Sequence, residues 1–388
     1  MRSVNYKLIC SLFLILAAGC VEPYLPPDGI GVGGQMVVDG FINASDKSVM
    51  VKLSRALTLA DANVTPPETK ATVKIVSSSG TEILLTESDN ENRLGTYAAS
   101  NLSLDPLAEY KLQVVTQSGS SFSSDYIKLR TSPAIDSLVW RPSDSGITFY
   151  VNSHDSENET RYYRWNYLET YEYYVPYISI FKKVGNLPVP RDSGEYVYRC
   201  WGTSPSTTIL VESTTRLAQD IVSMFPVHTI RKGDRKLMRK ARLIVQQHAI
   251  SSDEFEFWQL IRKTTETLGG LFDPMPSQVL GNIHSDDNEN EHVLGFFGGG
   301  FVTEKRIYVG LSDLPPELNT VDPSTLSCGD GGRAVPFAEV PSGVDANEVY
   351  VATYGNPVTL GYTVSSNSCA DCTSYGGTNS RPPDWPIF

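Results

Sequence analysis

The feature that most constrains the fold is the repeated alternation of apolar and polar residues across residues 35–132. In one of these short segments, Val49, Val51 and Leu53 alternate with residues of the opposite face. A period of two places successive side chains on opposite faces of a strand, and turn signals such as Ser79-Gly80 separate the segments. This region is therefore predicted to be an antiparallel, immunoglobulin-like β-sandwich.

Ser132-Pro133 marks the predicted end of this sandwich, and residues 133–388 are expected to form a larger β-rich domain. Strand-like segments continue beyond the boundary, and one pair suggests a hairpin that turns at residues 232–234 and returns through residues 236–249. With 20 tyrosines, 30 glycines and 24 prolines, the composition also favours strands and turns. The predicted fold class is mostly β.

One helix is predicted, over residues 251–268. Ser251 and Glu254 match a capping box, in which the two side chains satisfy the first unpaired N–H groups of a helix. Phe255 and Trp258 follow at helical spacing, and Gly269-Gly270 provides an end. We expect an amphipathic helix that packs its aromatic side chains on the β-rich domain.

The N-terminus is typical of a bacterial lipoprotein. Two cations, Arg2 and Lys7, precede an apolar run that is too short to span a bilayer but fits a signal peptide of residues 1–19. The run ends in Ala17-Ala18-Gly19-Cys20, which resembles the box at which lipoproteins are cleaved and lipidated. Residues 20–34 are expected to be a lipidated tether, whereas an ordinary cleaved signal or an uncleaved anchor are the alternatives.

Lipidation at Cys20 with chains such as palmitate would hold the protein on its membrane. Each buried CH₂ contributes about 0.8 kcal/mol, so several acyl chains give stable attachment where one does not. Beyond residue 20 no stretch is long and apolar enough to be a second anchor. The thiol of Cys20 is therefore the expected membrane attachment.

Charge and motifs exclude several function classes. A net charge of −12 argues against nucleic acid as the partner, since phosphate backbones attract basic surfaces. The sequence contains no GxSxG, HExxH or P-loop pattern, so no cofactor and no catalytic residue is predicted. Paired carboxylates that lie far apart in sequence remain a possible route to a hydrolase.

Four cysteines beyond the lipidation site suggest two disulfides. Cys369 and Cys372 are expected to pair separately with Cys200 and Cys328, which would pin the C-terminal tail, with the pairing left open. A Cys₄ zinc site would show a second CxxC pair, and a redox pair would sit at a helix N-terminus. Structural disulfides are the preferred interpretation.

An aromatic cluster lies within residues 161–177 and has two interpretations. In a strand, alternate rings are either core or exposed, and exposed rings can stack on sugars or peptides. Core packing is the simpler interpretation, and a ligand or partner surface is the alternative. The candidate contact residues are Tyr163, Trp165, Tyr167, Tyr171 and Tyr173.

Two charged segments have simple interpretations. Residues 284–292 combine oxygen and imidazole ligands, but the segment lacks the EF-hand pattern, so a solvated loop is preferred and no metal site is predicted. Residues 231–242 carry seven basic side chains and are interpreted as a polar hairpin. Contact with an anionic lipid, a glycan or acidic receptor loops is the alternative for this basic segment.

Several longer segments resemble the DUF4249 lipoproteins of Bacteroidota. They are ARLIVQQHAIS, then DEFEFWQLIRKTTETLGGLFDPMPSQVLGNI, then HVLGFFGGGFVTEKRIYV and a C-terminal CADCTSYGGTNSRPPDW. The resemblance implies outer-membrane surface lipoproteins often encoded beside TonB-dependent receptors, with no established catalytic residue. Within the most particular piece, residues 269–283, scaffold chemistry is the preferred interpretation, and a rigid loop that presents Met275 and Gln278 to a partner is the alternative.

Together these features predict a non-enzymatic lipoprotein on the outer membrane, exposed at the cell surface. It is expected to act as a binding or accessory subunit of a TonB-dependent receptor and to help capture an unidentified nutrient. The alternatives are a surface hydrolase acting on polysaccharide or peptide, and a structural or adhesive module of the envelope.

Overall fold

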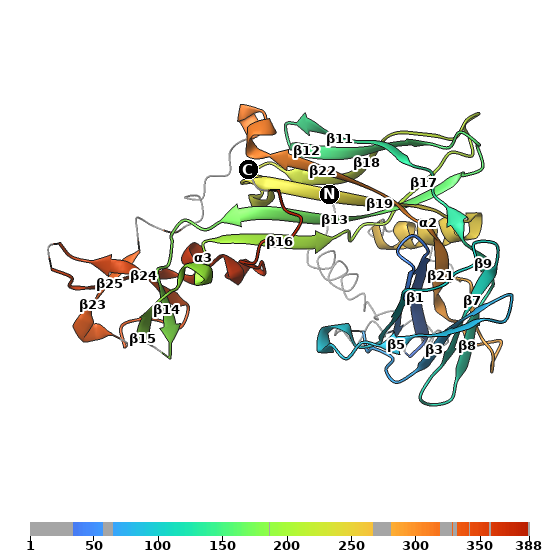
Figure 1. Cartoon of the computed structure of the whole chain (residues 1–388), viewed down its shortest axis with the longest axis horizontal. Helices are drawn as coiled ribbons and strands as arrows, with labels where there is room; N and C mark the ends of the chain where they lie inside the picture. Colours follow the sequence, from blue (N-terminus) through green and yellow to red (C-terminus); the bar gives the residue numbers. More distant parts are fainter. Residues whose placement is uncertain are drawn as a thin grey trace, which may run out of the picture.

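The computed structural model describes residues 34–56, 65–185, 187–266, 281–318, 328, 332–340, 342–356 and 358–386. The described chain is mostly β with one longer helix, which confirms the predicted fold class. Figure 1 shows three parts along the long axis: a first sandwich, a second sandwich and a small distal module. No helix in the described ranges is long and apolar enough to cross a membrane.

The first sandwich consists of two facing sheets with a shared apolar core. In strand β2 (Ser48–Arg55), Val49, Val51 and Leu53 are buried while their neighbours are more exposed, as the alternation predicted. One sheet contains, in spatial order, β10 (Arg130–Thr131), β21 (Leu294–Phe301), β1 (Met36–Asn43), β2, β6 (Thr96–Ser100) and β5 (Thr86–Glu87). The other contains β20 (Ile283–Ser285), β8 (Ser121–Ser124), β7 (Glu109–Val115), β3 (Thr72–Ser77) and β4 (Glu82–Leu84), with β9 (Ile127–Lys128) paired to β7.

Two strands of the first sandwich come from far along the chain. Strand β21 lies between β10 and β1 and pairs with β1 in parallel register from Val37↔Leu294 to Asn43↔Gly300. Strand β20 pairs with β8 in the facing sheet. The expected division at residue 132 falls between β10 and β11, whereas β20 and β21, which were assigned to the second domain, lie in the sheets of the first sandwich.

The second sandwich packs a three-stranded sheet on a larger one. Its core includes Trp165, Phe149 and Leu243 from the two facing sheets. The smaller sheet is β11 (Ile135–Ser143), β12 (Gly146–His154) and β18 (Ile221–Arg231). The larger sheet is β16 (Arg199–Pro205), β13 (Tyr162–Tyr174), β19 (Lys240–Ala249) and β22 (Thr303–Gly310), with β17 (Leu210–Ser213) also paired to β13.

The predicted hairpin across residues 232–234 is wrong. Strand β18 pairs with β12, whereas β19 pairs with β13 and β22, so the turn carries the chain from one sheet of the sandwich to the other. The alternation within β19 is nevertheless as predicted, because Ala241, Leu243 and Val245 all face the core.

The distal module lies at the opposite end of the molecule from the first sandwich (Figure 1). It combines the hairpin of β14 (Phe181–Val184) and β15 (Leu187–Pro190) with a three-stranded sheet and a short helix. The remaining elements are β23 (Arg333–Pro336), β25 (Gly361–Ser366), β24 (Glu348–Tyr354) and α3 (Asn367–Ala370).

The predicted helix is α2 (Ser252–Glu266), which packs beside both sandwiches. Its start agrees with the prediction, since Ser251 Oγ accepts a hydrogen bond of 3.1 Å from the Glu254 backbone N–H. The Glu254 side chain does not complete the capping box, because it turns inward towards Trp258 and Arg164. The expected end at Gly269-Gly270 lies outside the described residues.

Candidate functional site

Helix α2 and both sandwiches meet at a buried group of polar and aromatic side chains. Arg164 of β13 stacks 4.6 Å from the Trp258 ring centroid and 5.8 Å from that of Phe41 on β1. Its Nη1 lies 3.8 Å from Glu254 Oε1, and that oxygen also accepts a hydrogen bond of 3.2 Å from Trp258 Nε1. Burial raises the pKa of Glu254, although Arg164 opposes this effect.

His248 of β19 lies in the same buried group. Its ring meets Phe41 edge-on with centroids 4.8 Å apart, and neither ring nitrogen has a hydrogen-bond partner among the described residues. Burial, and secondarily the charge of Arg164, lower the pKa of His248 well below its usual value. The imidazole is therefore neutral in the folded protein at physiological pH.

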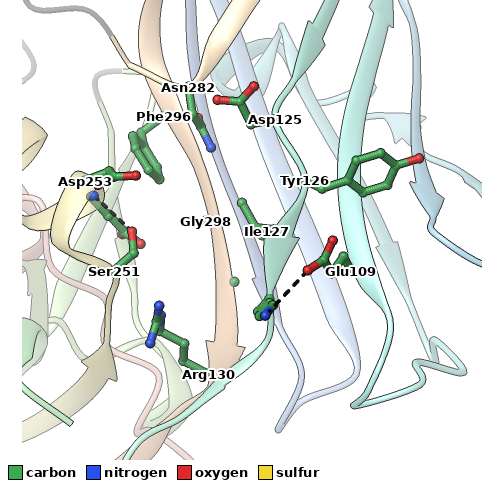
Figure 2. Close-up of a pocket in the computed structure, with 13 residues that line it drawn as sticks. Glu109, Asp125, Tyr126, Ile127, Arg130, Ser251, Asp253, Asn282, Phe296 and Gly298 are labelled. Atoms are coloured by element: carbon green, nitrogen blue, oxygen red, sulfur yellow. Dashed lines mark hydrogen bonds and ion pairs between the residues drawn. The ribbon is translucent and has the colours of Figure 1, made fainter. Parts of the chain in front are cut away.

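A cleft of about 300 Å³ opens beside this group, between α2 and strands β9, β10 and β21 (Figure 2). Glycines of β21 allow neighbouring groups to approach the strand closely here: a Cβ at Gly298 would lie only 3.0 Å from Glu254 Oε2, and one at Gly300 would lie 2.5 Å from the Arg130 carbonyl oxygen. Arg130 and Asp253 place opposite charges on the rim. This arrangement suits recognition of a small polar ligand by fixed charges and hydrogen bonds.

A second buried ionic group lies within the second sandwich. The Glu169 side chain is 1% exposed and accepts a 2.5 Å hydrogen bond from Lys236 Nζ, and its carboxylate lies 3.0 Å from His228 Nε2. Burial alone would raise the pKa of Glu169, but the hydrogen bonds and charges of His228 and Lys236 outweigh burial and hold the pKa below its ordinary value. The group connects β13 of the larger sheet with β18 of the smaller sheet and with the segment between β18 and β19.

The model of the family described as "Domain of unknown function (DUF4249)" matches residues 21–306, which is most of the chain. The chain belongs to the DUF4249 family. The match spans both sandwiches as far as β22 and includes Arg164, His248 and Glu254. Beyond the matched segment lie the three-stranded sheet of the distal module and three of the four disulfide cysteines of this DUF4249 chain.

The other comparisons add little. No curated protein matches the chain. A solved structure described as "Biofilm associated protein - BSP domain" is similar at 8% identity over 75% of this chain, with a TM-score of 0.15. The chain spans 62% of the length of that structure, and a likeness at this level supports no argument about the fold or activity.

Three of the predicted contact residues of the DUF4249 chain are core residues. Tyr163, Trp165 and Tyr173 are at most 1% exposed, so of the two interpretations of the aromatic cluster, core packing describes them. Trp165 Nε1 donates to Gln247 Oε1 at 2.9 Å, and the Tyr173 hydroxyl donates to the Cys372 carbonyl at 2.7 Å. Burial raises the pKa of Tyr173 to about 12.

The other predicted contact residues are distributed differently. Tyr167 and Tyr171 are half-buried: the ring centroid of Tyr167 lies 4.5 Å from that of His228, and the ring centroid of Tyr171 lies 5.7 Å from that of Tyr173. Met275 and Gln278 lie outside the described residues, as does Cys20.

The predicted disulfides are confirmed, with Cys200 bonded to Cys372 and Cys328 bonded to Cys369. The first links β16 of the second sandwich to the C-terminal segment, and the second closes a loop onto α3. Each cysteine of the CxxC pair therefore reaches a different partner, as predicted.

The acidic segment 284–292 is partly tied to the first sandwich. Asp286 accepts hydrogen bonds from the hydroxyls of Ser121 at 2.8 Å and Ser123 at 2.5 Å. Within the described ranges, no three His, Cys, Asp or Glu side chains are grouped so that they could hold a metal ion.

The buried group at the meeting point of the sandwiches was not predicted. Arg164, His248 and Glu254 are polar residues in alternating or helical segments, and such residues are usually solvent-exposed. The one sequence signal was the position of His248 at the end of a strand, directly before the apolar residues Ala249 and Ile250.

Proposed function

We propose that this protein is a lipid-anchored binding protein of the bacterial outer membrane that acts without catalysis. In this proposal Cys20 carries the lipid, and the folded body serves as an accessory subunit of a TonB-dependent receptor in nutrient uptake. The location and the receptor are what the resemblance to DUF4249 lipoproteins implies.

The observation that carries the proposal is the pair of disulfides. Disulfides persist in oxidising compartments and are rare in the cytosol, so Cys200–Cys372 and Cys328–Cys369 favour a site of action outside the cytoplasm. Their position supports a binding role, because Cys200–Cys372 attaches the C-terminal segment to the second sandwich and Cys328–Cys369 ties the segment before β23 to α3 of the distal module. A covalently braced surface loses little conformational entropy when a partner binds.

The geometry at α2 also suits binding. The fixed ionic and aromatic contacts of Arg164, Glu254 and Trp258 hold the two sandwiches and the helix around one polar cleft. Ligand sites are commonly found where domains meet, and a preformed cleft avoids the cost of ordering on binding.

The anchor is tested by metabolic labelling with a palmitate analogue in a bacterial host, followed by membrane fractionation. The Cys20→Ala variant should lose both the label and the membrane fraction, whereas the matched control Cys10→Ala should keep both. Full membrane retention of the unlabelled Cys20→Ala variant would contradict the anchor.

The receptor is tested by cross-linking intact cells and purifying the protein through a C-terminal tag. A TonB-dependent receptor should co-purify with wild type, and its absence after cross-linking would contradict the accessory role. Release of products from a polysaccharide or peptide substrate by the purified protein would contradict the non-catalytic role.

A further inference from the structure

A second polar cavity, of about 580 Å³, opens at the ends of β12 and β18 in the second sandwich. It shares no lining residue with the cleft beside α2. Its volume is within the roughly 300–1,000 Å³ range of small-molecule sites.

A β-bulge shapes one wall of this cavity. Val151 pairs with Phe225 and Ser153 with Val222, so Ser223 and Met224 together oppose Asn152 alone. Bulges of this kind redirect side chains and are frequent beside functional sites.

The backbone of the bulge is strained at Met224. Met224 has a φ of 51°, which is unfavourable for a residue with a Cβ. The Asn152 side chain stabilises this conformation, because its Oδ1 accepts a 2.8 Å hydrogen bond from the Met224 N–H and its Nδ2 donates to Ser137 at 2.9 Å. Strain that its surroundings impose is typical of binding sites.

An Asp–His pair also lines this cavity. Asp136 Oδ2 is 2.7 Å from His154 Nδ1, and this hydrogen bond raises the pKa of His154. Because the carboxylate fixes Nδ1 as the donor, Nε2 is the nitrogen left to accept a hydrogen bond in the neutral ring.

The other carboxylates at this cavity are already engaged. Asp155 accepts hydrogen bonds from the backbone N–H groups of residues 157, 159 and 160 at 2.8–3.1 Å. Asp220 is 1% exposed and accepts hydrogen bonds from the hydroxyls of Tyr163 and Thr214. These two groups build the wall and are not available to a ligand.

Three groups on the cavity wall are left to donate or accept hydrogen bonds. Among the described residues, no protein group hydrogen-bonds the Gln219 amide, the Ser223 hydroxyl or His154 Nε2, although all three residues line the cavity. An anion would meet the carboxylates of Asp136 and Asp155, and an apolar ligand would leave the amide and hydroxyl unpaired. A neutral ligand with several hydroxyl groups matches both the donors and the acceptors.

We propose that this cavity binds a neutral saccharide, whose hydroxyl groups hydrogen-bond Gln219, Ser223 and His154. The proposal rests on the binding role proposed above and adds a ligand class and a second site to it. Its test uses purified protein without receptor or lipid, so the saccharide site and the membrane association can fail separately.

The test is saturation-transfer NMR on the full chain in mild detergent, with four neutral probes: maltotetraose, cellotetraose, mannotetraose and xylotetraose. At least one probe should bind with a Kd of about 1 mM, as expected for a few hydrogen bonds in an open cavity. Gln219→Ala and His154→Ala should each weaken binding about tenfold, since each removes one hydrogen-bonding group worth about 1.4 kcal/mol.

The matched control is His284→Ala, which removes another exposed histidine paired with an aspartate, 3.3 Å from Asp125 on the first sandwich. This variant should bind the saccharide as wild type does. Circular dichroism shows whether each variant is folded, and the double variant Gln219→Ala/Ser223→Ala provides a second site variant that keeps the Asp136–His154 pair.

Three results would overturn the proposal. The first is no saturation transfer to any of the four saccharides. The second is equal binding by wild type and by the folded site variants. The third is binding of the polyamine spermidine with no saccharide binding, since the carboxylates would then be the recognition groups.

Discussion

Replacing Lys236 by methionine should destabilise the protein strongly, because it leaves the Glu169 carboxylate buried with one partner fewer. Glu169 is 1% exposed and its carboxylate lies 2.5 Å from the Lys236 ammonium. Removing one member of a buried ion pair costs about 3–5 kcal/mol. His228 remains 3.0 Å from the same carboxylate, so we expect Lys236→Met to lower the free energy of unfolding by about 3 kcal/mol, at the low end of this range.

A second substitution, at Glu169, should restore part of the stability that Lys236→Met loses. In the double variant Lys236→Met/Glu169→Gln no charge is left unpaired, and the amide can still hydrogen-bond His228. The double variant should therefore be more stable than Lys236→Met alone by about 1–2 kcal/mol. A simple loss of packing at Lys236 would give no such recovery.

The assay is urea unfolding followed by tryptophan fluorescence, since Trp165 lies in the core of the same sandwich. The matched control is Lys74→Met, which breaks a surface pair with Glu82 whose side chains are 31% and 57% exposed. Exposed pairs contribute about 0–1 kcal/mol, so the control should unfold nearly as wild type does. The reasoning is refuted if Lys236→Met resembles Lys74→Met, or if the double variant is no more stable than Lys236→Met.

Three further predictions concern stability. Below a pH of about 6.5 the unfolded state binds a proton at His248 while the folded state does not, so the free energy of unfolding should fall by about 1.4 kcal/mol between pH 7.5 and 5.5. His248→Leu should remove this fall, which is measured as the change of the urea midpoint with pH. An unchanged slope would contradict a buried neutral imidazole. Gly298→Val should cost about 1–3 kcal/mol in the same unfolding assay because its side chain meets the Glu254 carboxylate. Gly194→Val should be neutral, since no atom of the described residues lies within 4 Å of a Cβ there, and equal effects of the two variants would refute the contact. Changing both Cys328 and Cys369 to serine removes a disulfide between positions 41 residues apart and should lower the free energy of unfolding by about 4 kcal/mol. The loss should appear as faster proteolysis of the distal module under oxidising conditions, and wild-type resistance to proteolysis would show that this disulfide is dispensable.

Local patterns predicted the parts of the fold that depend on neighbouring residues. The alternation around Val51 and Ala241 placed these side chains in the core, and Ser251 marked the start of α2. The same patterns could not show which sheet a strand joins. The turn before β19 is a good hairpin signal, yet the two strands beside it belong to different sheets, since β18 pairs with β12 and β19 pairs with β13 and β22.

Local patterns also could not predict the candidate site, because its side chains come from elements that are far apart in the sequence. Glu254 fits a helix cap by spacing alone, but its carboxylate is turned inward by Arg164, which is 90 residues earlier in the chain and on another element. The glycines of β21 resemble a flexible linker in sequence. Their role becomes visible only beside Glu254 and Arg130, where any side chain would collide.

The late arrival of β21 has a consequence for biosynthesis. Strand β1 is synthesised early in translation. Its parallel neighbour β21 ends at Phe301 and leaves the ribosome only after β11, β12 and β18, which form the smaller sheet of the second sandwich. Until then one edge of β1 is open and can pair with another chain. A nascent chain of this protein therefore needs protection from edge-to-edge association, and a fragment that stops at residue 132 should aggregate where the complete chain does not.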